Sequence, residues 1–382
     1  MLAVAVVTVT AWPAPARAAG ISVRTVLGPG TLATPGGIAL DAAGDMYVAD
    51  TGHCRVVKVQ TGAPARGGLH LRAGSAATLA GGRCTGAGSF GHPTGVAVDG
   101  RGDVYVAEAT DERVVVVHPS GTVATVAGTG RAGFNGDGGS ATDAELDAPT
   151  GVAVDSAGDI YIADTADCRV RVVPANDTTL FGQTMSAGRI YTVAGTGVCG
   201  AAGQGGAAAR AQLWNPVAVT VDRAGDLLVA DSGDQSVLLA SAQGGTYFGT
   251  AVGAGDIGVV VGGTGSYGPY LADGLSATGI AAEVNDPRGL ALGPTGALFL
   301  TDGYMHVVRV VPATTGTLLG RAMTAGDLYT AAGALPVATS EGAGDGTRWV
   351  LTHMGVPSGI AVSSGGSVYF SDAARDEVRV IG

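Results

Sequence analysis

The chain has 382 residues, of which 46% are hydrophobic and 14% are charged, and its formal net charge is −11. This acidic balance argues against nucleic acid as a partner and against an electrostatic hold on anionic membranes, because basic patches perform both tasks. The hydrophobic content is enough for a sizeable core, and beyond the first residues we find no apolar stretch long enough for a membrane-spanning helix.

The first predicted element is a secretory signal. An apolar run over residues 2–12 is followed by Ala-Arg-Ala at 16–18, a small-residue pattern typical of signal cleavage. We expect residues 1–19 to be removed on export, with cleavage after Ala18 or Ala19. No Lys or Arg precedes the run, and a truncated or misplaced start of the reading frame is the alternative explanation.

The rest of the chain is built from one repeated unit, clearest in Pro149–Val173, which reads PTGVAVDSAGDIYIADTADCRVRVV. Its three runs rich in Val, Ile and Tyr are separated by turns with Gly and Asp, a pattern that predicts three strands. Further copies begin at Pro35, Pro93, Pro216, Pro287 and Pro357. An acidic residue closes the second strand of every copy: Asp50, Glu108, Asp164, Asp231, Asp302 and Asp372. We interpret these side chains as caps of the turns that they begin, bonding backbone N–H groups, in preference to metal ligands.

A fourth strand can be identified in each gap between copies. These strands are Ala77–Ala80, Val123–Ala127, Ile190–Ala194, Gly258–Val261 and Asp327–Ala332. The sixth copy runs out at Gly382 without one, and Ile21–Gly28 resembles the missing strand. We therefore predict an all-β fold: a six-bladed β-propeller of four-stranded antiparallel blades, with the ring closed by the N-terminal strand. Closure removes the unpaired strand edge that would otherwise invite aggregation.

Two kinds of loop interrupt the repeats. Blades three, four and five carry an added stretch between their third and fourth strands: Phe181–Gly195, Phe248–Gly262 and Leu319–Gly333. We expect hairpin extensions or small flaps on the bottom face of the ring. The loop Gly133–Gly139 has glycines but only one carboxylate, Asp137, so we interpret it as a structural turn and not as a phosphate or calcium loop.

The repeated pattern PxGIAVDxxGxIYVADTxxxRVxVV resembles that of NHL repeats, a family that forms six-bladed β-propellers. The stretch Gly128–Asp155 is similar to a loop of the long-blade NHL proteins common in secreted bacterial chains, and to the NHL region of teneurins. The resemblance implies that residues 20–382 form a single NHL-type β-propeller domain. It is specific for the fold and says little about function, because this scaffold hosts binding modules and enzymes alike.

The four cysteines hold equivalent places in two blades. Cys54 and Cys168 precede the third strand, and Cys84 and Cys199 follow the fourth. Loops after the second and fourth strands lie on the same face of an up-and-down blade, so we favour Cys54–Cys84 and Cys168–Cys199 among the three connectivities. Reduced thiols and a four-cysteine metal site are the alternatives, although CxxC-like spacing is absent. The disulfides would imply an oxidising compartment.

The mouth of the central channel is the default place for a ligand in a closed β structure. The residues nearest to it stand just before each repeat proline. The polar candidates are His92, Asn215 and Asp286, joined by Arg288 after its proline and by Trp214 as a stacking surface. We predict a small-ligand or cation site there, with a merely solvated loop rim as the plainer alternative.

We expect a secreted recognition module, acting as a monomer, that binds an extracellular protein, peptide or glycan through the channel-mouth face. The alternative is a metal-dependent lactonase-like hydrolase or lyase with its site at the central channel. Asn215 and Asp286 could serve in part as the metal ligands of a lactonase, but we find no convincing Glu. A lyase would need several inward histidines, and only His92 stands where one is expected. No cofactor is predicted, and a divalent cation in the channel is left open.

Overall fold

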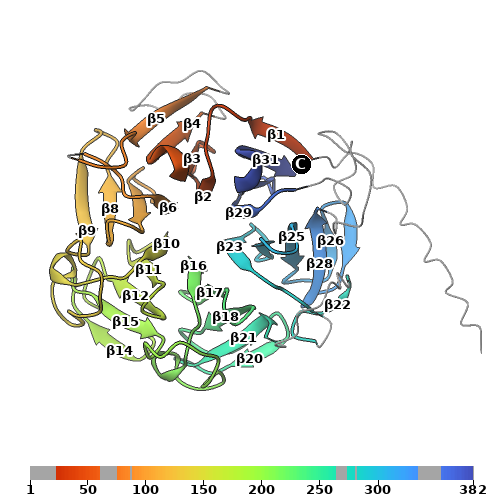
Figure 1. Ribbon diagram of the computed structural model, residues 1–382. Helices are drawn as coiled ribbons and strands as arrows, with labels where there is room; N and C mark the ends of the chain where they lie inside the picture. The colour runs from red at the N-terminus through yellow and green to blue at the C-terminus, as the bar shows by residue number, and fades with distance from the viewer. Residues whose placement is uncertain are drawn as a thin grey trace, which may run out of the picture.

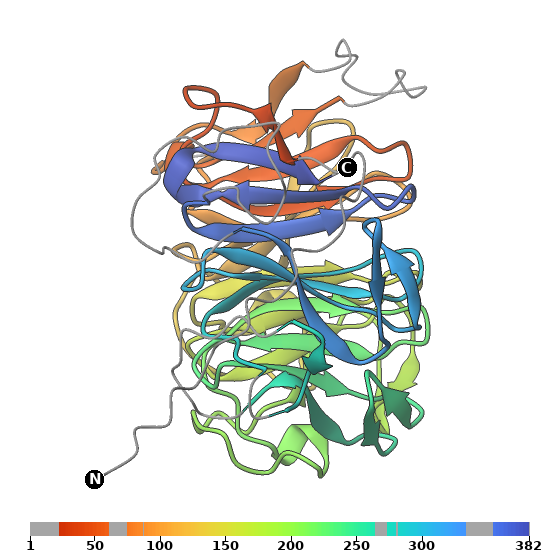
Figure 2. The ribbon, with the colours of Figure 1, turned by 90° about the vertical axis from the view of Figure 1, so that its right-hand side faces the viewer.

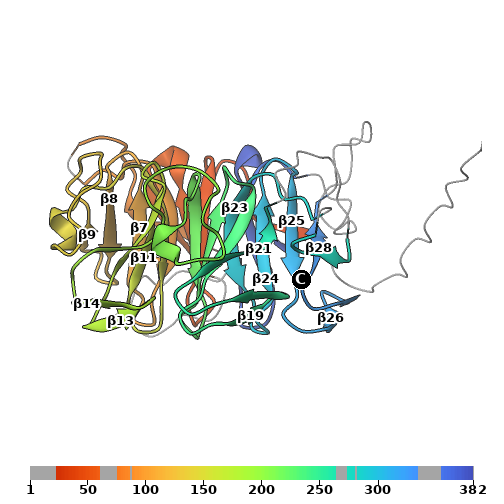
Figure 3. The ribbon, with the colours of Figure 1, turned by 90° about the horizontal axis from the view of Figure 1, so that it is seen from below.

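The computed structural model describes residues 23–60, 75–86, 88–263, 273–279, 282–333 and 354–381, and the predicted signal segment 1–19 lies outside them. Six antiparallel sheets surround a central axis (Figure 1), which confirms the prediction of an all-β, six-bladed propeller. Side views show the blades forming a flattened disc (Figures 2 and 3). Helix within the described ranges is confined to short 3₁₀ turns: η1 (Thr51–His53), η2 (Ala141–Asp143), η3 (Ala208–Arg210) and η5 (Ala373–Arg375).

Each blade runs from an inner strand at the axis to an outer strand at the rim. The strands of blades one to three are β2 (Pro35–Leu40), β3 (Met46–Asp50), β4 (Arg55–Val59) and β5 (Ala76–Gly81); β6 (Pro93–Val98), β7 (Val104–Glu108), β8 (Arg113–Val117) and β9 (Val123–Ala127); β10 (Pro149–Val154), β11 (Ile160–Asp164), β12 (Arg169–Val173) and β15 (Tyr191–Ala194). Those of blades four to six are β16 (Pro216–Val221), β17 (Leu227–Asp231), β18 (Ser236–Ala240) and β21 (Ile257–Gly262); β23 (Pro287–Leu292), β24 (Leu298–Asp302), β25 (Val307–Val311) and β28 (Asp327–Ala332); β29 (Pro357–Val362), β30 (Val368–Asp372), β31 (Glu377–Ile381) and β1 (Val23–Leu27). Blade five gains a fifth, short strand outside β28: β22 (Leu275–Ser276).

The ring is closed by the first strand, as the sequence predicts. β1 pairs antiparallel with β31, and Val23 lies opposite Ile381 in the register. A second tie joins the last blade to the first, because the backbone N–H of Thr34 donates to Oδ1 of Asp376 at 2.7 Å. The edge of β31 is therefore paired, and the sixth blade is completed by residues from the opposite end of the chain.

Adjacent blades are bound near the axis by side-chain hydroxyls that donate to carbonyl oxygens of the next blade. Thr94 Oγ1 donates to Thr150 O at 2.9 Å, and Ser371 Oγ donates to Gly36 O at 2.6 Å across the closure. Glycines on the inner strands let the backbones come this close. A Cβ at Gly95 would lie 2.6 Å from Thr150 O, which real side chains do not tolerate. The glycine two positions beyond most repeat prolines thus has a packing reason.

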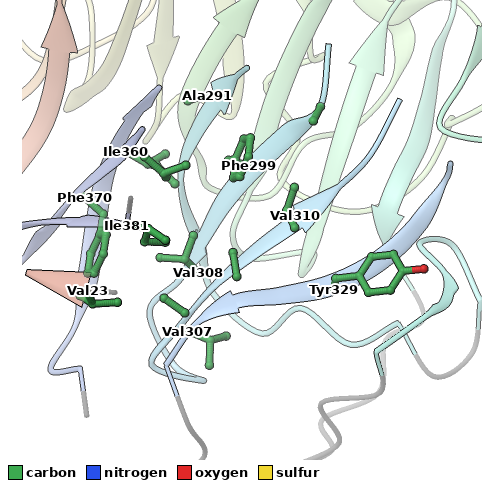
Figure 4. Close-up of a cluster of buried hydrophobic side chains, with 14 of the residues drawn as sticks. Val23, Ala291, Phe299, Val307, Val308, Val310, Tyr329, Ile360, Phe370 and Ile381 are labelled. Atoms are coloured by element: carbon green, nitrogen blue, oxygen red, sulfur yellow. The ribbon is translucent and has the colours of Figure 1, made fainter. Parts of the chain in front are cut away.

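Alternating apolar side chains fill the space between blades. Figure 4 shows the cluster between blades five and six, to which Phe299 of β24, Ile360 of β29 and Phe370 of β30 all contribute. Val23 of β1 joins the same cluster, so the closing strand contributes apolar surface as well as hydrogen bonds. Burying one side chain of this size stabilises the fold by about 1.5–3 kcal/mol.

The added stretches of blades three, four and five are hairpins, as predicted. They are formed by β13 (Thr178–Leu180) with β14 (Gln183–Met185), β19 (Gly245–Tyr247) with β20 (Thr250–Val252), and β26 (Gly316–Leu318) with β27 (Arg321–Met323). Figure 3 shows them along the lower rim of the disc. They follow third strands, whose ends point away from the loops that lead into the repeat prolines.

The loop Gly133–Gly139 is held by protein contacts. Asp137 accepts a hydrogen bond from the buried guanidinium of Arg171 at 2.7 Å and another from the backbone N–H of Thr192 at 3.2 Å. Arg171 also donates to the carbonyl oxygens of Asn135 and Glu145. These bonds account for the single carboxylate of the loop as a structural group.

The recurrent acidic residue has a different partner from the one that the sequence suggests. All six of these side chains are buried. In five blades the carboxylate accepts the backbone N–H of the residue 17 positions earlier, in the loop that leads into the repeat proline. We call these segments the lead-in loops. Asp302 also binds the N–H of Met305 in its own turn at 3.0 Å. The interpretation as turn caps is thus corrected: the acids mainly fasten the lead-in loops, whose N–H groups have no strand partner.

Both predicted disulfides are confirmed, between Cys54 and Cys84 and between Cys168 and Cys199, with Cα atoms 5.1 and 5.3 Å apart. Cys54 and Cys168 stand four positions after the recurrent acid and have positive φ values of 52° and 50°. In blades two and six the same left-handed position carries Glu112 and Asp376, whose carboxylates bind a lead-in loop of the next blade. One position therefore fastens neighbouring loops in two ways, covalently or by hydrogen bonds.

Candidate ligand site at the channel mouth

A cavity of about 490 Å³ opens at the end of the channel where the lead-in loops meet the inner strands. Its wall is made largely by the first residues of the inner strands. Glycines there leave the backbone exposed to the cavity, and threonines and serines supply hydroxyl groups. Among the residues that line it, only Asp286 and Arg288 carry a charge. The volume falls within the range of small-molecule pockets.

Three of the predicted site residues line this cavity on the side of blades four and five: Asn215, Asp286 and Arg288. Arg288 Nε donates to Asp286 Oδ2 at 2.5 Å, and Ser232 Oγ donates to Asp286 Oδ1 at 2.6 Å. The second bond joins the two blades, since Ser232 follows β17 and Asp286 precedes β23. Gly303 makes room for the pair, because a Cβ there would lie 2.7 Å from Cδ of Arg288.

Trp214 directly precedes Asn215 in the chain and is not itself among the residues that line the cavity; 53% of it is exposed. Its backbone N–H donates to Oδ1 of the buried Asp231 at 2.8 Å. Its indole lies against Gly233, where a Cβ would be 2.6 Å from Cγ of the ring. The sequence prediction of a stacking surface therefore corresponds to an exposed indole with a fixed backbone anchor.

His92 is placed apart from the other four. It lies in the lead-in loop of blade two, outside the cavity lining, with an exposed ring whose Nδ1 is 3.3 Å from Oγ1 of Thr110. The structure thus brings Asn215, Asp286 and Arg288 together in the cavity lining, keeps Trp214 next to Asn215 in the chain, and leaves His92 elsewhere on the same face.

Tyr304 is a candidate that sequence reasoning missed. It lies two positions beyond Asp302 in the turn after β24, and 70% of it is exposed. In blade four the equivalent position is Gly233, which the indole of Trp214 covers. Trp214 and Tyr304 therefore stand at the same turn of two neighbouring blades, and neither is among the residues that line the cavity. The signal was an aromatic residue where the other turns carry Gly, Ala or Thr.

Burial changes the acidity of the carboxyls beneath this face. Burial raises the pKa of Asp231 to about 7, with the Trp214 N–H opposing the shift and the nearby Asp234 adding to it. Burial likewise raises the pKa of Asp164 to about 8 and raises that of Asp302, where the N–H groups of Asn285 and Met305 oppose it. These carboxyls hold lead-in loops from within the fold and do not face the cavity.

The carboxylate of Asp286 is engaged within the protein. Both oxygens of Asp286 already accept hydrogen bonds, and one of them comes from a guanidinium that would repel a metal ion. Within the described part of the chain no group of three or more His, Cys, Asp or Glu side chains is arranged to hold a metal. No described helix is long and apolar enough to cross a membrane.

Comparison with known protein families finds the NHL repeat over residues 32–59 and 146–173, which are parts of blades one and three. Human teneurin-4 is 36% identical over 106 residues, which are 24% of this chain and 4% of teneurin-4. The protein SUPPRESSOR OF QUENCHING 1, chloroplastic, of Arabidopsis thaliana is 33% identical over 86 residues, which are 22% of this chain and 8% of that protein. The matches thus span only a small part of these much longer relatives.

Solved structures match the whole ring at low sequence identity. An auxiliary nutrient binding protein from Bacteroides thetaiotaomicron has a TM-score of 0.59 at 12% identity, covering 95% of this chain and 76% of that one. A gluconolactonase from Xanthomonas campestris has a TM-score of 0.56 at 13% identity, covering 96% and 90%. These likenesses show the fold alone. The matched repeats and the six closed blades show that the chain is a six-bladed β-propeller that carries NHL repeats in blades one and three.

Proposed function

We propose that the chain is an exported binding module that recognises an extracellular protein, peptide or glycan at the channel mouth. The observation that carries this proposal is the asymmetry of the mouth. The polar side chains of Asn215, Asp286 and Arg288 line one side of a 490 Å³ cavity, and the exposed Trp214 and Tyr304 belong to the loops of the same two blades. Concave sites with a few converging polar groups and exposed aromatics are typical of ligand recognition.

Two further features support the proposal. Disulfides persist in oxidising compartments, so the bonds at Cys54–Cys84 and Cys168–Cys199 support export through the signal expected at residues 1–19. The closed ring completes every blade among the described sheets without a strand from a second chain, which supports a monomer.

The test compares ligand binding by the wild type with binding by an Asn215→Ala, Asp286→Ala variant. Ala148 adopts a φ of 47° at the position equivalent to Asn215, so alanine is tolerated there. Thr246→Ala, in the exposed β19–β20 hairpin on the opposite face, is the matched control. We would screen a displayed peptide library and a glycan array. Ligands that bind the control like the wild type and the double variant at least about tenfold more weakly support the proposal. Ligands that bind all three proteins equally would reject it.

The alternative function is a metal-dependent hydrolase or lyase, and it rests on Asn215 and Asp286, which both line the cavity. We favour binding because Asp286 is engaged by Arg288 and Ser232. Elemental analysis of protein purified without chelator tests the alternative. About one divalent ion per chain, lost in the double variant, would favour the enzyme and lead to lactone and ester substrates.

A further inference from the structure

We propose that the channel mouth binds a neutral oligosaccharide, with Trp214 and Tyr304 as stacking surfaces and the cavity wall as its hydrogen-bonding side. This inference rests on the proposed binding function and names its ligand class. Three features carry it: two exposed rings on neighbouring blades, a neutralised charge pair in the cavity lining, and a cavity wall rich in hydrogen-bond acceptors.

The two rings provide flat apolar surface at fixed places. Trp214 is 53% exposed and Tyr304 is 70% exposed, which is unusual for aromatic side chains of this size. Each has a rigid base: the backbone of Trp214 is held by Asp231, and the turn of Tyr304 is held by the bond from Met305 N to Asp302. The C–H face of a pyranose ring is apolar and packs flat on an aromatic ring, so such surfaces suit sugars at low entropic cost.

The charge in the cavity lining is neutralised within the protein. Arg288 and Asp286 form an ion pair at 2.5 Å, and they are the charged side chains of the cavity lining. A phosphate, carboxylate or ammonium ligand would have to compete with this pair for its partner. The site therefore favours a ligand without net charge.

Three hydroxyls of the cavity lining, from blades one, two and four, donate their hydrogens within the protein. Thr51, Thr94 and Ser232 donate their hydrogens to Pro93 O, Thr150 O and Asp286 Oδ1. Each hydroxyl has one hydrogen to donate and two lone pairs, so these groups remain acceptors toward a ligand. A matching ligand must donate many hydrogen bonds without carrying a positive charge, which describes a polyol.

A peptide fits the same wall less well. Each peptide unit offers one donor and one acceptor, and binding usually requires an open strand edge or a deep side-chain pocket. The inner strands at this mouth lie side by side around the axis, with their neighbouring backbones in contact at the glycines. A sugar, with donors around its rim and apolar faces, meets both the wall and the rings.

The experiment is isothermal titration calorimetry with three neutral probes: cellotetraose, maltotetraose and triacetylchitotriose. We expect at least one to bind the wild type. Trp214→Ala and Tyr304→Ala should each weaken binding by about tenfold, the loss of one stacking contact. Phe134→Ala, which removes an exposed aromatic ring from the loop before blade three, away from blades four and five, is the matched control and should leave binding unchanged. Near-UV circular dichroism checks that each variant is folded.

A pair of charge variants tests the neutrality of the ligand. For a neutral sugar, Asp286→Asn and Arg288→Gln should both weaken binding, and raising salt from about 0.05 M to about 0.5 M should change the affinity less than about twofold. An anionic ligand would bind Asp286→Asn more tightly, and a cationic ligand would bind Arg288→Gln more tightly. Either gain would overturn the inference.

Failure here can be separated from failure of the proposed function. No heat from any probe up to about 10 mM, or binding that survives loss of both rings, would overturn the saccharide inference. If a displayed peptide bound the wild type and not the Asn215→Ala, Asp286→Ala variant, the mouth would remain a binding site and the ligand class would be wrong.

Discussion

Asp231 makes a sharp prediction about pH, because its carboxyl is buried and its protonated form has a close mimic in asparagine. Oδ1 accepts the Trp214 N–H, and Oδ2 has no partner within the described ranges. An asparagine at this position would keep the first bond through its carbonyl and leave its amino group where the carboxyl proton stands. The Asp231→Asn variant therefore isolates the free energy of carrying a charge at this position.

The magnitude follows from the change in acidity. Burial raises the pKa of Asp231 from 3.8 to about 7, and a difference of that size corresponds to about 4 kcal/mol of differential stability. Below about pH 4 the carboxyl is protonated in both states, and its contribution is complete. As pH rises toward 7 the folded state retains a proton that the unfolded state has lost, so stability falls. Above about pH 7 the folded state contains a buried charge, and the contribution is gone.

The assay is urea unfolding of wild type and Asp231→Asn at several values between about pH 4 and pH 8.5. The free energy of unfolding of the variant relative to the wild type should rise by about 4 kcal/mol over this range. Asp143→Asn, at an exposed carboxylate, is the control, and its difference should stay within about 0.5 kcal/mol. A variant-to-wild-type difference that is constant across the whole pH range would refute the reasoning, because the carboxyl would then titrate alike in both states.

Three other predictions concern the ring itself. Replacing Cys168 and Cys199 by Ser should lower the free energy of unfolding by about 3 kcal/mol in the chain-entropy picture, measured by urea unfolding with and without reductant; no difference would contradict it. Gly95→Ala should lower the free energy of unfolding by about 1–3 kcal/mol in urea unfolding, because the added Cβ meets a carbonyl oxygen of the next blade. The exposed Gly100 has open space around it, so Gly100→Ala is the control and should cost little. Val23→Asp should cost more than about 3 kcal/mol, since it places a charge in the core and weakens closure; thermal unfolding unchanged from wild type would argue against the closing strand.

Much of the fold was predictable because the sequence pattern that specifies a blade is repeated along the chain. The repeated prolines and apolar runs placed the blades, and β9 and β28 match the predicted Val123–Ala127 and Asp327–Ala332 at both ends. The disulfides followed from the equal places of the cysteines in the repeat. Closure followed from one missing strand at the end of the pattern and one surplus strand at its beginning.

The remainder was hidden because its partners are not local in sequence. Periodicity located the acid at Asp164 but could not show that its carboxylate binds the backbone of Asp147, on the far side of two strands. The sequence identified Asp286 and Arg288 as separate candidate residues. It could not show that they form an ion pair with each other, because that bond depends on the conformations of both side chains. Tyr304 was not identified because it stands in one of the weaker copies of the repeat, where a residue that departs from the pattern is not distinctive.

The pairing of β1 with β31 has a consequence for how the molecule is made. Thr25 and Glu377 are in contact across 352 residues of chain, so the contact that completes the ring is among the most distant in sequence that it contains. During synthesis the earlier blades can form while the first strand has no neighbour. Ring closure must therefore wait until translation has supplied β31, so the last blade is the last part of the propeller that can be completed.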